Sequence, residues 1–127
     1  MNPATSQNST TRRVVVIDDN ADIRESLQIL LAMWGHEVAM AAEGRAGVDL
    51  VVRDRPDVAL IDVGLPGMDG YDVAREIRQS LPNGATKLIA VTGYGQPSDR
   101  ELARQAGFDM HLLKPISPEV LQRLLVE

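Results

Sequence analysis

The sequence predicts an α/β protein in which a parallel sheet lies between two layers of helices, a three-layer sandwich. Short apolar segments rich in β-branched residues alternate five times with segments of helical periodicity. Only 3% of the residues are aromatic while 44% are hydrophobic, so Val, Leu, Ile and Ala must build the core. The connections are short, which implies right-handed crossovers between parallel strands. A chain of 127 residues has the size of one domain.

Five segments have the apolar character of buried strands. They are residues 14–17, 36–41, 58–61, 88–91 and 110–113. The first is an uninterrupted β-branched run, which is typical of a strand covered on both faces, and the second is the weakest of the five.

Five segments between and after these strands are predicted to be helices. The first carries apolar residues at helical spacing and stops at Gly35, and the second runs over 44–53 and ends before Pro56. The third covers 71–80, the fourth begins at Ser98 and reaches Gly107, and the last begins at Ser117, which is followed by proline at the first helical position.

The termini and the overall charge exclude several classes of protein. Residues 1–11 are polar and aperiodic and are predicted to be a disordered tail, which leaves 12–127 as the domain. A net charge of -5 without a basic run argues against binding nucleic acid through its phosphates. The chain lacks cysteine, a signal peptide and an apolar run long enough to span a bilayer, which fits a location in the cytoplasm.

Polar residues follow four of the five predicted strands. The first strand leads into Asp18 and Asp19, the third into Asp62, the fourth into Thr92 and the fifth into Lys114. The carboxyl ends of parallel strands lie on one edge of an open sheet, where ligands bind in such folds. We therefore expect three carboxylates, a hydroxyl and an ammonium group to meet there.

Each of these residues also has an ordinary structural explanation. The aspartates fit helix caps with Asn20 assisting, Thr92 fits a strand end, and Lys114 fits a solvated surface. Capping, however, needs one short oxygen per helix and not an adjacent pair of acids with a lysine before proline. The convergence of complementary charges at four strand ends favours a ligand site.

Clustered carboxylates raise each other's pKa unless a cation lies among them. Mg²⁺ fits this role best, because it binds one or a few carboxylates and keeps waters that a phosphate can replace. The sequence offers no cysteine or histidine cluster for zinc or a softer metal.

At these residues the chain resembles the receiver domains of two-component response regulators, from about Arg13 to Leu125. The resemblance rests on motifs in the right order: Asp18-Asp19-Asn20, Asp62 with the turn at 65–70, Val91-Thr92-Gly93, Ala106-Gly107-Phe108-Asp109 and Lys114-Pro115. It implies a flavodoxin-like fold with five parallel strands in the order 2-1-3-4-5 and five helices.

The resemblance also implies a role for each matching residue. Asp62 would be the nucleophile that takes a phosphoryl group from the phosphohistidine of a histidine kinase or a histidine phosphotransfer domain. Asp18, Asp19, Asp62 and the backbone carbonyl of Gly64 would hold Mg²⁺. Lys114 and the Thr92 hydroxyl would contact phosphoryl oxygens, which agrees with the charge neutralisation that phosphoryl transfer requires.

Three further residues belong to the switching step that the resemblance implies. Pro115 matches a proline whose preceding peptide bond is cis, which would aim Lys114 inward. Phosphate would draw Thr92 toward the site, and an aromatic residue on the fifth strand would turn inward, changing the surface of the fourth helix, fifth strand and fifth helix. His111 stands at that aromatic position, and a half-buried strand histidine without a switch role explains it equally well.

The predicted function is a phosphoacceptor signalling domain that catalyses its own phosphorylation and dephosphorylation and is not otherwise an enzyme. We expect no output domain and no bound nucleic acid, and either a free-standing regulator or the receiver of a hybrid histidine kinase, which residues 107–115 resemble most. A constitutive interaction module would typically have lost an acid or the lysine. A phosphate-ester hydrolase would need a carboxylate where Gly64 stands, and a flavin protein would need a hydroxyl- and glycine-rich loop after the first strand.

Overall fold

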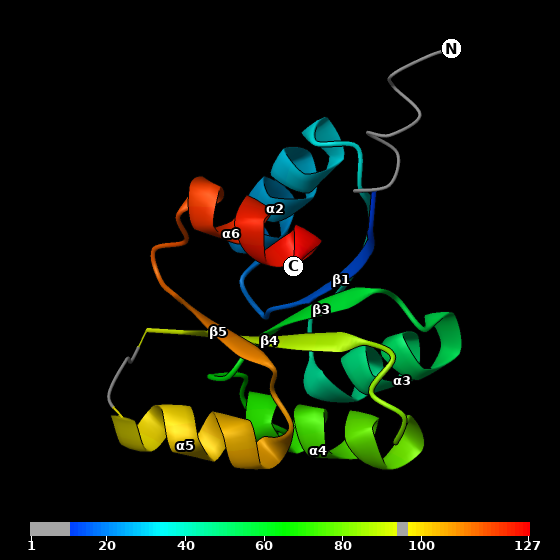
Figure 1. The fold of residues 1–127 in the computed structure, drawn as a ribbon, viewed down its shortest axis with the longest axis vertical. Helices are drawn as coiled ribbons and strands as arrows, with labels where there is room; N and C mark the ends of the chain where they lie inside the picture. The colour runs from blue at the N-terminus through cyan, green and yellow to red at the C-terminus, as the bar shows by residue number, and fades with distance from the viewer. Residues whose placement is uncertain (1–10, 94–96) are drawn as a thin grey trace.

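The computed structural model describes residues 11–93 and 97–127 (Figure 1). Its sheet has the strand order β2-β1-β3-β4-β5, and all four neighbouring pairs are parallel. The strands are β1 (Arg13–Ile17), β2 (Glu37–Ala41), β3 (Val58–Asp62), β4 (Lys87–Thr92) and β5 (Met110–Leu113). The predicted fold and strand order are confirmed. The tail predicted for residues 1–11 lies, apart from Thr11, outside the described residues.

Helices cover both faces of the sheet, as the three-layer prediction requires. They are α2 (Ala21–Met33), α3 (Gly44–Asp54), α4 (Gly70–Ser80), α5 (Pro97–Ala106) and α6 (Pro118–Val126). Figure 1 shows α2 and α6 on one face and α3, α4 and α5 on the other. None of the helices in the described ranges is long and apolar enough to cross a membrane.

Successive side chains of the central strands point to opposite faces of the sheet and so contribute to two separate cores. In β1, Val15 and Ile17 pack into the core that includes Val48 of α3, whereas Val14 and Val16 pack into the core on the opposite face. Successive side chains of a strand point to opposite faces, so an all-apolar strand supplies both cores at once. This explains why the buried strands read as continuous apolar runs rather than as alternating patterns.

The helix termini show which polar residues act as caps. Asn20 caps α2 and accepts hydrogen bonds from the backbone N–H groups of Asp22 and Ile23, and Asp69 caps α4 in the same way. The capping explanation of the three strand-end aspartates is therefore wrong for α2 and α4. Ser117 caps α6 as predicted.

Several predicted helix boundaries move by a residue or two, among them the start of α4 at Gly70 instead of Tyr71. The helix predicted to end before Pro56 ends at Asp54, because Arg55 takes a left-handed backbone conformation with φ of 49°. The helix predicted from Ser98 begins at Pro97.

Arg78 joins three segments at the edge of the sheet where β4 and β5 begin. Its guanidinium donates to the carbonyl oxygens of Gly107 and Thr86, both at 2.9 Å, and to Asp109 Oδ2 at 2.7 Å. Asp109 Oδ2 also accepts from the backbone N–H of Leu88 at 2.9 Å. The guanidinium thus links α4 to the segments that lead into β4 and β5.

A buried histidine occupies the same edge, at the start of β2. His36 Nδ1 accepts a hydrogen bond of 2.9 Å from the backbone N–H of Arg12, whose side chain donates to the carbonyl oxygen of Leu125 at 3.0 Å. Burial and then the Arg12 charge lower the pKa of His36. The unprotonated Nδ1 therefore contributes a bond that joins the start of β1 to β2.

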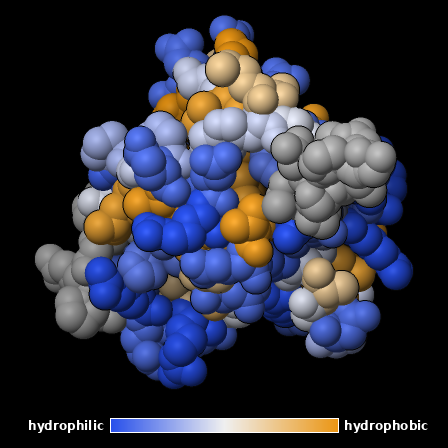
Figure 2. All heavy atoms as spheres, turned by 45° about the horizontal axis from the view of Figure 1, so that its top comes forward, coloured by the Kyte–Doolittle hydropathy of each residue, from blue (hydrophilic) through white to orange (hydrophobic). Residues whose placement is uncertain are grey.

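Apolar side chains on the surface are scattered. Figure 2 shows one face on which small hydrophobic groups are separated by hydrophilic ones. Within the described ranges, the large exposed apolar residues are Ile29, Met33, Leu102, Leu113 and Val126. Ile29 and Met33 lie one turn apart on α2, whereas the other three belong to different elements, and scattered residues of this kind are usual on a folded surface.

Candidate functional site

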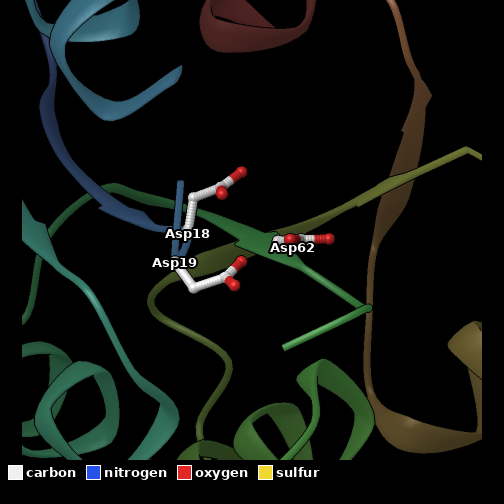
Figure 3. Close-up of side chains that lie close together, drawn as sticks. All are labelled: Asp18, Asp19 and Asp62. Atoms are coloured by element: carbon white, nitrogen blue, oxygen red, sulfur yellow. The ribbon is translucent and has the colours of Figure 1, made fainter. Parts of the chain in front are cut away.

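Three carboxylates meet at the carboxyl edge of the sheet. The register of the central strands places Ile17 beside Ile61, so the residues that follow them, Asp18 and Asp62, become neighbours. One oxygen from each of Asp18, Asp19 and Asp62 lies within 4.8 Å of the other two. Figure 3 shows the three side chains extending from the ends of β1 and β3 to a common side. Asp18 and Asp62 are buried, whereas Asp19 is exposed.

Backbone N–H groups orient the two buried acids. Asp18 Oδ1 accepts from the N–H of Asn20 at 2.9 Å, and Asp62 Oδ1 accepts from the N–H of Gly64 at 3.0 Å. Each bond joins a carboxylate to the residue two positions further on, so the turn after each strand fixes its own acid. The Asp18 N–H in turn donates to the carbonyl oxygen of Ala41 at the end of β2, at 3.1 Å.

Lys114 brings one cation to the acids. Its Nζ lies 3.5 Å from Asp62 Oδ1 and 3.8 Å from Asp18 Oδ2. The backbone N–H of Lys114 donates to the carbonyl oxygen of Thr92 at 2.9 Å, and the peptide bond to Pro115 is cis. Although 31% of its side chain is exposed, Lys114 therefore reaches into the site and is not a solvated surface lysine.

The electrostatics of the site leave it short of positive charge. Burial is the largest cause that raises the pKa of Asp18, and the negative charges of Asp62 and Asp19 raise it further. The Asn20 N–H and the Lys114 ammonium oppose this without cancelling it. Three hard oxygen donors facing one amine form the kind of ligand set that suits a divalent cation such as Mg²⁺.

Thr92 and Gly64 lie at or just beyond the carboxyl ends of central strands, at the same edge of the sheet as the acids. Thr92 is the last residue of β4, is buried, and pairs with Leu113 of β5. A Cβ added at Gly64 would lie 3.5 Å from Asp62 Oδ1, so any side chain there would contact the carboxylate.

His111 lies in the middle of β5, half-buried, and lines a cavity of about 10 Å³ together with Thr92, Tyr71 and Asp99. Such a space holds at most a single water molecule. Burial and, to a lesser extent, the charge of Arg100 lower the pKa of His111. The histidine and the threonine that the resemblance links in a switch thus border one small cavity.

An open groove begins at the site. It has a volume of about 400 Å³ and lies between α2 and the segment that follows β5. Its lining is mostly apolar and includes Ile23, Leu27, Leu30 and Ile116, with Lys114 at the end nearest the acids.

Sequence reasoning missed one residue that contacts the site. Arg24 on α2 donates from Nη1 to the backbone carbonyl oxygen of Asp18 at 2.9 Å. Any amino acid at position 18 would carry that backbone carbonyl, so no pattern of side chains predicts the contact.

The comparisons with known proteins agree with this geometry. The sequence profile of the family described as the response regulator receiver domain matches residues 14–126. The fold and the site thus define a flavodoxin-like α/β protein with an acid cluster at the carboxyl edge of its parallel sheet. The chain belongs to the response regulator receiver domain family.

Individual relatives show how similar the chain is to known members. Response regulator MprA of Mycolicibacterium vanbaalenii is 37% identical over 112 residues, which are 86% of this chain and 46% of the relative. The chain thus spans less than half the length of MprA. Chemotaxis protein CheY4 of Vibrio cholerae has a TM-score of 0.85 at 29% identity, over 91% of this chain and 96% of that one.

A third relative is known with a metal ion. The receiver domain of sensor histidine kinase PA1611 from Pseudomonas aeruginosa has a TM-score of 0.82 at 33% identity, covering 91% of this chain and 94% of that one. Its structure holds a magnesium ion in the active site cleft.

Proposed function

We propose that this chain is a phosphoacceptor signalling domain in which Asp62 receives a phosphoryl group from the phosphohistidine of a histidine kinase or histidine phosphotransfer domain. The observation that carries the proposal is the cluster of Asp18, Asp19 and Asp62 within 4.8 Å, with Lys114 Nζ 3.5 Å from Asp62. In this proposal the domain comprises residues 12–127 and catalyses only its own phosphorylation and dephosphorylation. It binds no nucleic acid.

Asp62 is the nucleophile because of how its carboxylate is held. Oδ1 is already engaged by the Gly64 N–H and lies near Lys114, so a bond to phosphorus is best formed by the other oxygen. That bond forms as the bond between phosphorus and the donor imidazole nitrogen breaks, and the nitrogen keeps the electron pair. Later attack of water on phosphorus restores the carboxylate and releases inorganic phosphate.

Charge neutralisation is the main requirement of this transfer. Asp18, Asp19, Asp62 and the backbone carbonyl of Gly64 would hold Mg²⁺, which when bound offsets the negative charge of the acids and of the phosphoryl oxygens. Lys114 is close enough to Asp62 to pair with a phosphoryl oxygen on that side chain. The Thr92 hydroxyl is the donor proposed for a second phosphoryl oxygen.

The proposed signal passes from Thr92 to the surface formed by α5, β5 and α6. Movement of Thr92 toward a phosphoryl group would change the cavity that it shares with His111. A new position of the His111 side chain would then alter the β5 surface, to which the exposed Leu113 belongs. The downstream partner would read this surface.

The groove beside Lys114 is the proposed docking site of the phosphodonor protein. Lys114, which lies 3.5 Å from Asp62, lines this groove, and the apolar lining between α2 and Ile116 suits an apolar helix face. A donor histidine presented from such a helix would meet Asp62 from the open side of the site.

Intact-mass measurement after incubation with acetyl phosphate tests the proposal. The wild type should gain one phosphoryl group when Mg²⁺ is present and none in EDTA. Asp62→Asn should gain none in either condition, because an amide oxygen is too weak a nucleophile. Asp49→Asn is the matched control, since Asp49 lies on α3 with 71% of its side chain exposed, and it should behave as the wild type does.

Two results would contradict the proposal. A wild-type protein that gains no mass and shows no NMR shifts at Asp62 with beryllofluoride would instead be a constitutive interaction module. A phosphoryl group retained by Asp62→Asn would place the acceptor at another residue.

A further inference from the structure

Hydrogen bonds fix the backbone on both sides of Asp18. The N–H of Asp18, which belongs to the preceding peptide group, donates to the carbonyl oxygen of Ala41 at the end of β2. At the Asp18 carbonyl, Arg24 Nη1 donates to the oxygen at 2.9 Å. That carbonyl belongs to the peptide group that joins the two acids, so its orientation sets the direction in which the chain delivers Asp19.

Asp19 depends on this peptide more than the other two acids do. Asp18 and Asp62 are buried, and each accepts a backbone N–H in its own turn. Asp19 is exposed, and within the described part of the chain its side chain makes no hydrogen bond or ion pair. The backbone at positions 18 and 19 is therefore what keeps its carboxylate beside the others (Figure 3).

Arg24 is suited to hold that backbone. Its own N–H makes the first hydrogen bond of α2, to the carbonyl oxygen of Asn20 at 3.0 Å, so the guanidinium projects from a residue fixed relative to the turn. A guanidinium is a charged donor, and a charged donor makes a stronger bond to a carbonyl than a neutral one.

Arg24 contacts the site through the backbone and not through an acid side chain. Among the described residues, its guanidinium makes no ion pair with Asp18, Asp19 or Asp62. Its contact with the site is the single bond to the backbone.

We propose that Arg24 is a positioning residue, which holds the Asp18–Asp19 peptide so that Asp19 remains in place as a ligand of the divalent cation. This inference rests on the proposed function, because it assigns Arg24 a role in the same cation site. It adds a residue that touches neither the phosphoryl group nor the cation.

The test measures how the phosphorylation rate with acetyl phosphate depends on Mg²⁺ concentration, together with Mg²⁺ affinity by calorimetry. Arg24→Ala should bind Mg²⁺ about 10-fold more weakly, the lower end of what loss of a supporting contact costs a metal site. The maximal rate at saturating Mg²⁺ should stay close to that of the wild type, since Asp62, Lys114 and Thr92 are untouched. Arg24→Lys retains a charged donor and should recover most of the affinity.

Arg53→Ala removes the same charge from the exposed end of α3, where Arg53 pairs only with the adjacent Asp54 among the described residues. It should bind Mg²⁺ as the wild type does. The inference is overturned if Arg24→Ala matches the wild type in half-saturating Mg²⁺, if Arg53→Ala weakens binding equally, or if Arg24→Lys is as weak as Arg24→Ala. Should Arg24→Ala fail to fold, the comparison of Arg24→Lys and Arg24→Gln decides, because only the former keeps the charge.

Failure of this inference is distinguishable from failure of the proposed function. If the wild type itself neither binds Mg²⁺ nor accepts a phosphoryl group, the proposed function is wrong, and the role of Arg24 falls with it. If the wild type does both and the Arg24 variants do so with unchanged Mg²⁺ dependence, only the positioning role is wrong.

Discussion

The buried carboxylate of Asp18 lowers the stability of the metal-free protein, and Asp18→Asn tests this directly. Its pKa is raised in the folded state, chiefly by burial. A raised carboxyl pKa means that the protonated form favours folding, so that contribution is present below the unfolded pKa near 3.8 and is lost as the pH rises. At neutral pH the ionised group therefore opposes folding. An asparagine keeps the oxygen that accepts the Asn20 N–H but carries no charge.

The size of the effect follows from the distances. Asp18 and Asp62 each place an oxygen within 4.8 Å of the other, so their repulsion is at least about 3 kcal/mol with an effective dielectric constant of about 20. Attraction between Asp18 and Lys114 at 3.8 Å is about 4 kcal/mol, so these two nearly cancel. Burying the charge of Asp18 costs several kcal/mol. The hydrogen bond to its carboxylate offsets roughly 1.5–3 kcal/mol of that cost. We expect Asp18→Asn to raise the free energy of unfolding by about 1–2 kcal/mol.

Urea unfolding at pH 7.5 in EDTA, followed by the fluorescence of the only tryptophan, Trp34, measures the change. Adding Mg²⁺ should stabilise the wild type and leave Asp18→Asn nearly unchanged, because binding to the folded state alone shifts unfolding. Asp49→Asn on the surface should change stability by no more than about 0.5 kcal/mol. The reasoning fails if Asp18→Asn is less stable than the wild type in EDTA, or if both respond equally to Mg²⁺.

Two further predictions concern the opposite edge of the sheet. The lowered pKa of His36 means that the unfolded chain takes up a proton near pH 6.5 before the folded one does, so stability should fall as the pH drops from 7.5 to 5.5. In His36→Asn the side-chain oxygen can replace Nδ1 as acceptor, so the free energy of unfolding measured in urea should fall less over that pH range. A pH dependence equal to that of the wild type would show that His36 is not its cause. Arg78→Ala should lower the free energy of unfolding by about 3 kcal/mol, because two backbone carbonyls lose a charged donor. A loss no greater than that of the exposed Arg75→Ala would refute this role.

The sequence was sufficient to predict the fold and the gathering of Asp18, Asp19, Asp62 and Lys114 at one edge of the sheet. Continuous β-branched runs such as 14–17 can be buried on both faces only in a covered parallel sheet, so they determine the class of fold. Polar residues directly after those runs must then lie on one edge, which is why Asp18, Asp62 and Lys114 were expected to meet. Roles within the site, including the switch at His111, remain predictions.

Side-chain and backbone geometry was not available from the sequence. Capping was the ordinary explanation weighed against a ligand site for the strand-end acids, because Asp is a good cap wherever it stands, and only the helix starts showed that Asn20 and Asp69 cap α2 and α4. The ion pair between Arg78 and Asp109 spans 31 positions. Arg78 also donates to the carbonyl oxygen of Gly107, and no residue pattern predicts a contact with a backbone carbonyl.

Local pattern thus determined the location of each strand to within a residue and which charges gather at the sheet edge, because side-chain hydrophobicity and strand periodicity are written in the sequence itself. The tertiary structure decided which oxygen of each acid is engaged, how far Lys114 lies from Asp62, and that Arg24 holds the peptide between the two neighbouring acids. The hydrogen bonds among these features use backbone N–H and C=O groups, which are not specific to any residue type. Their partners are chosen only when the chain has packed.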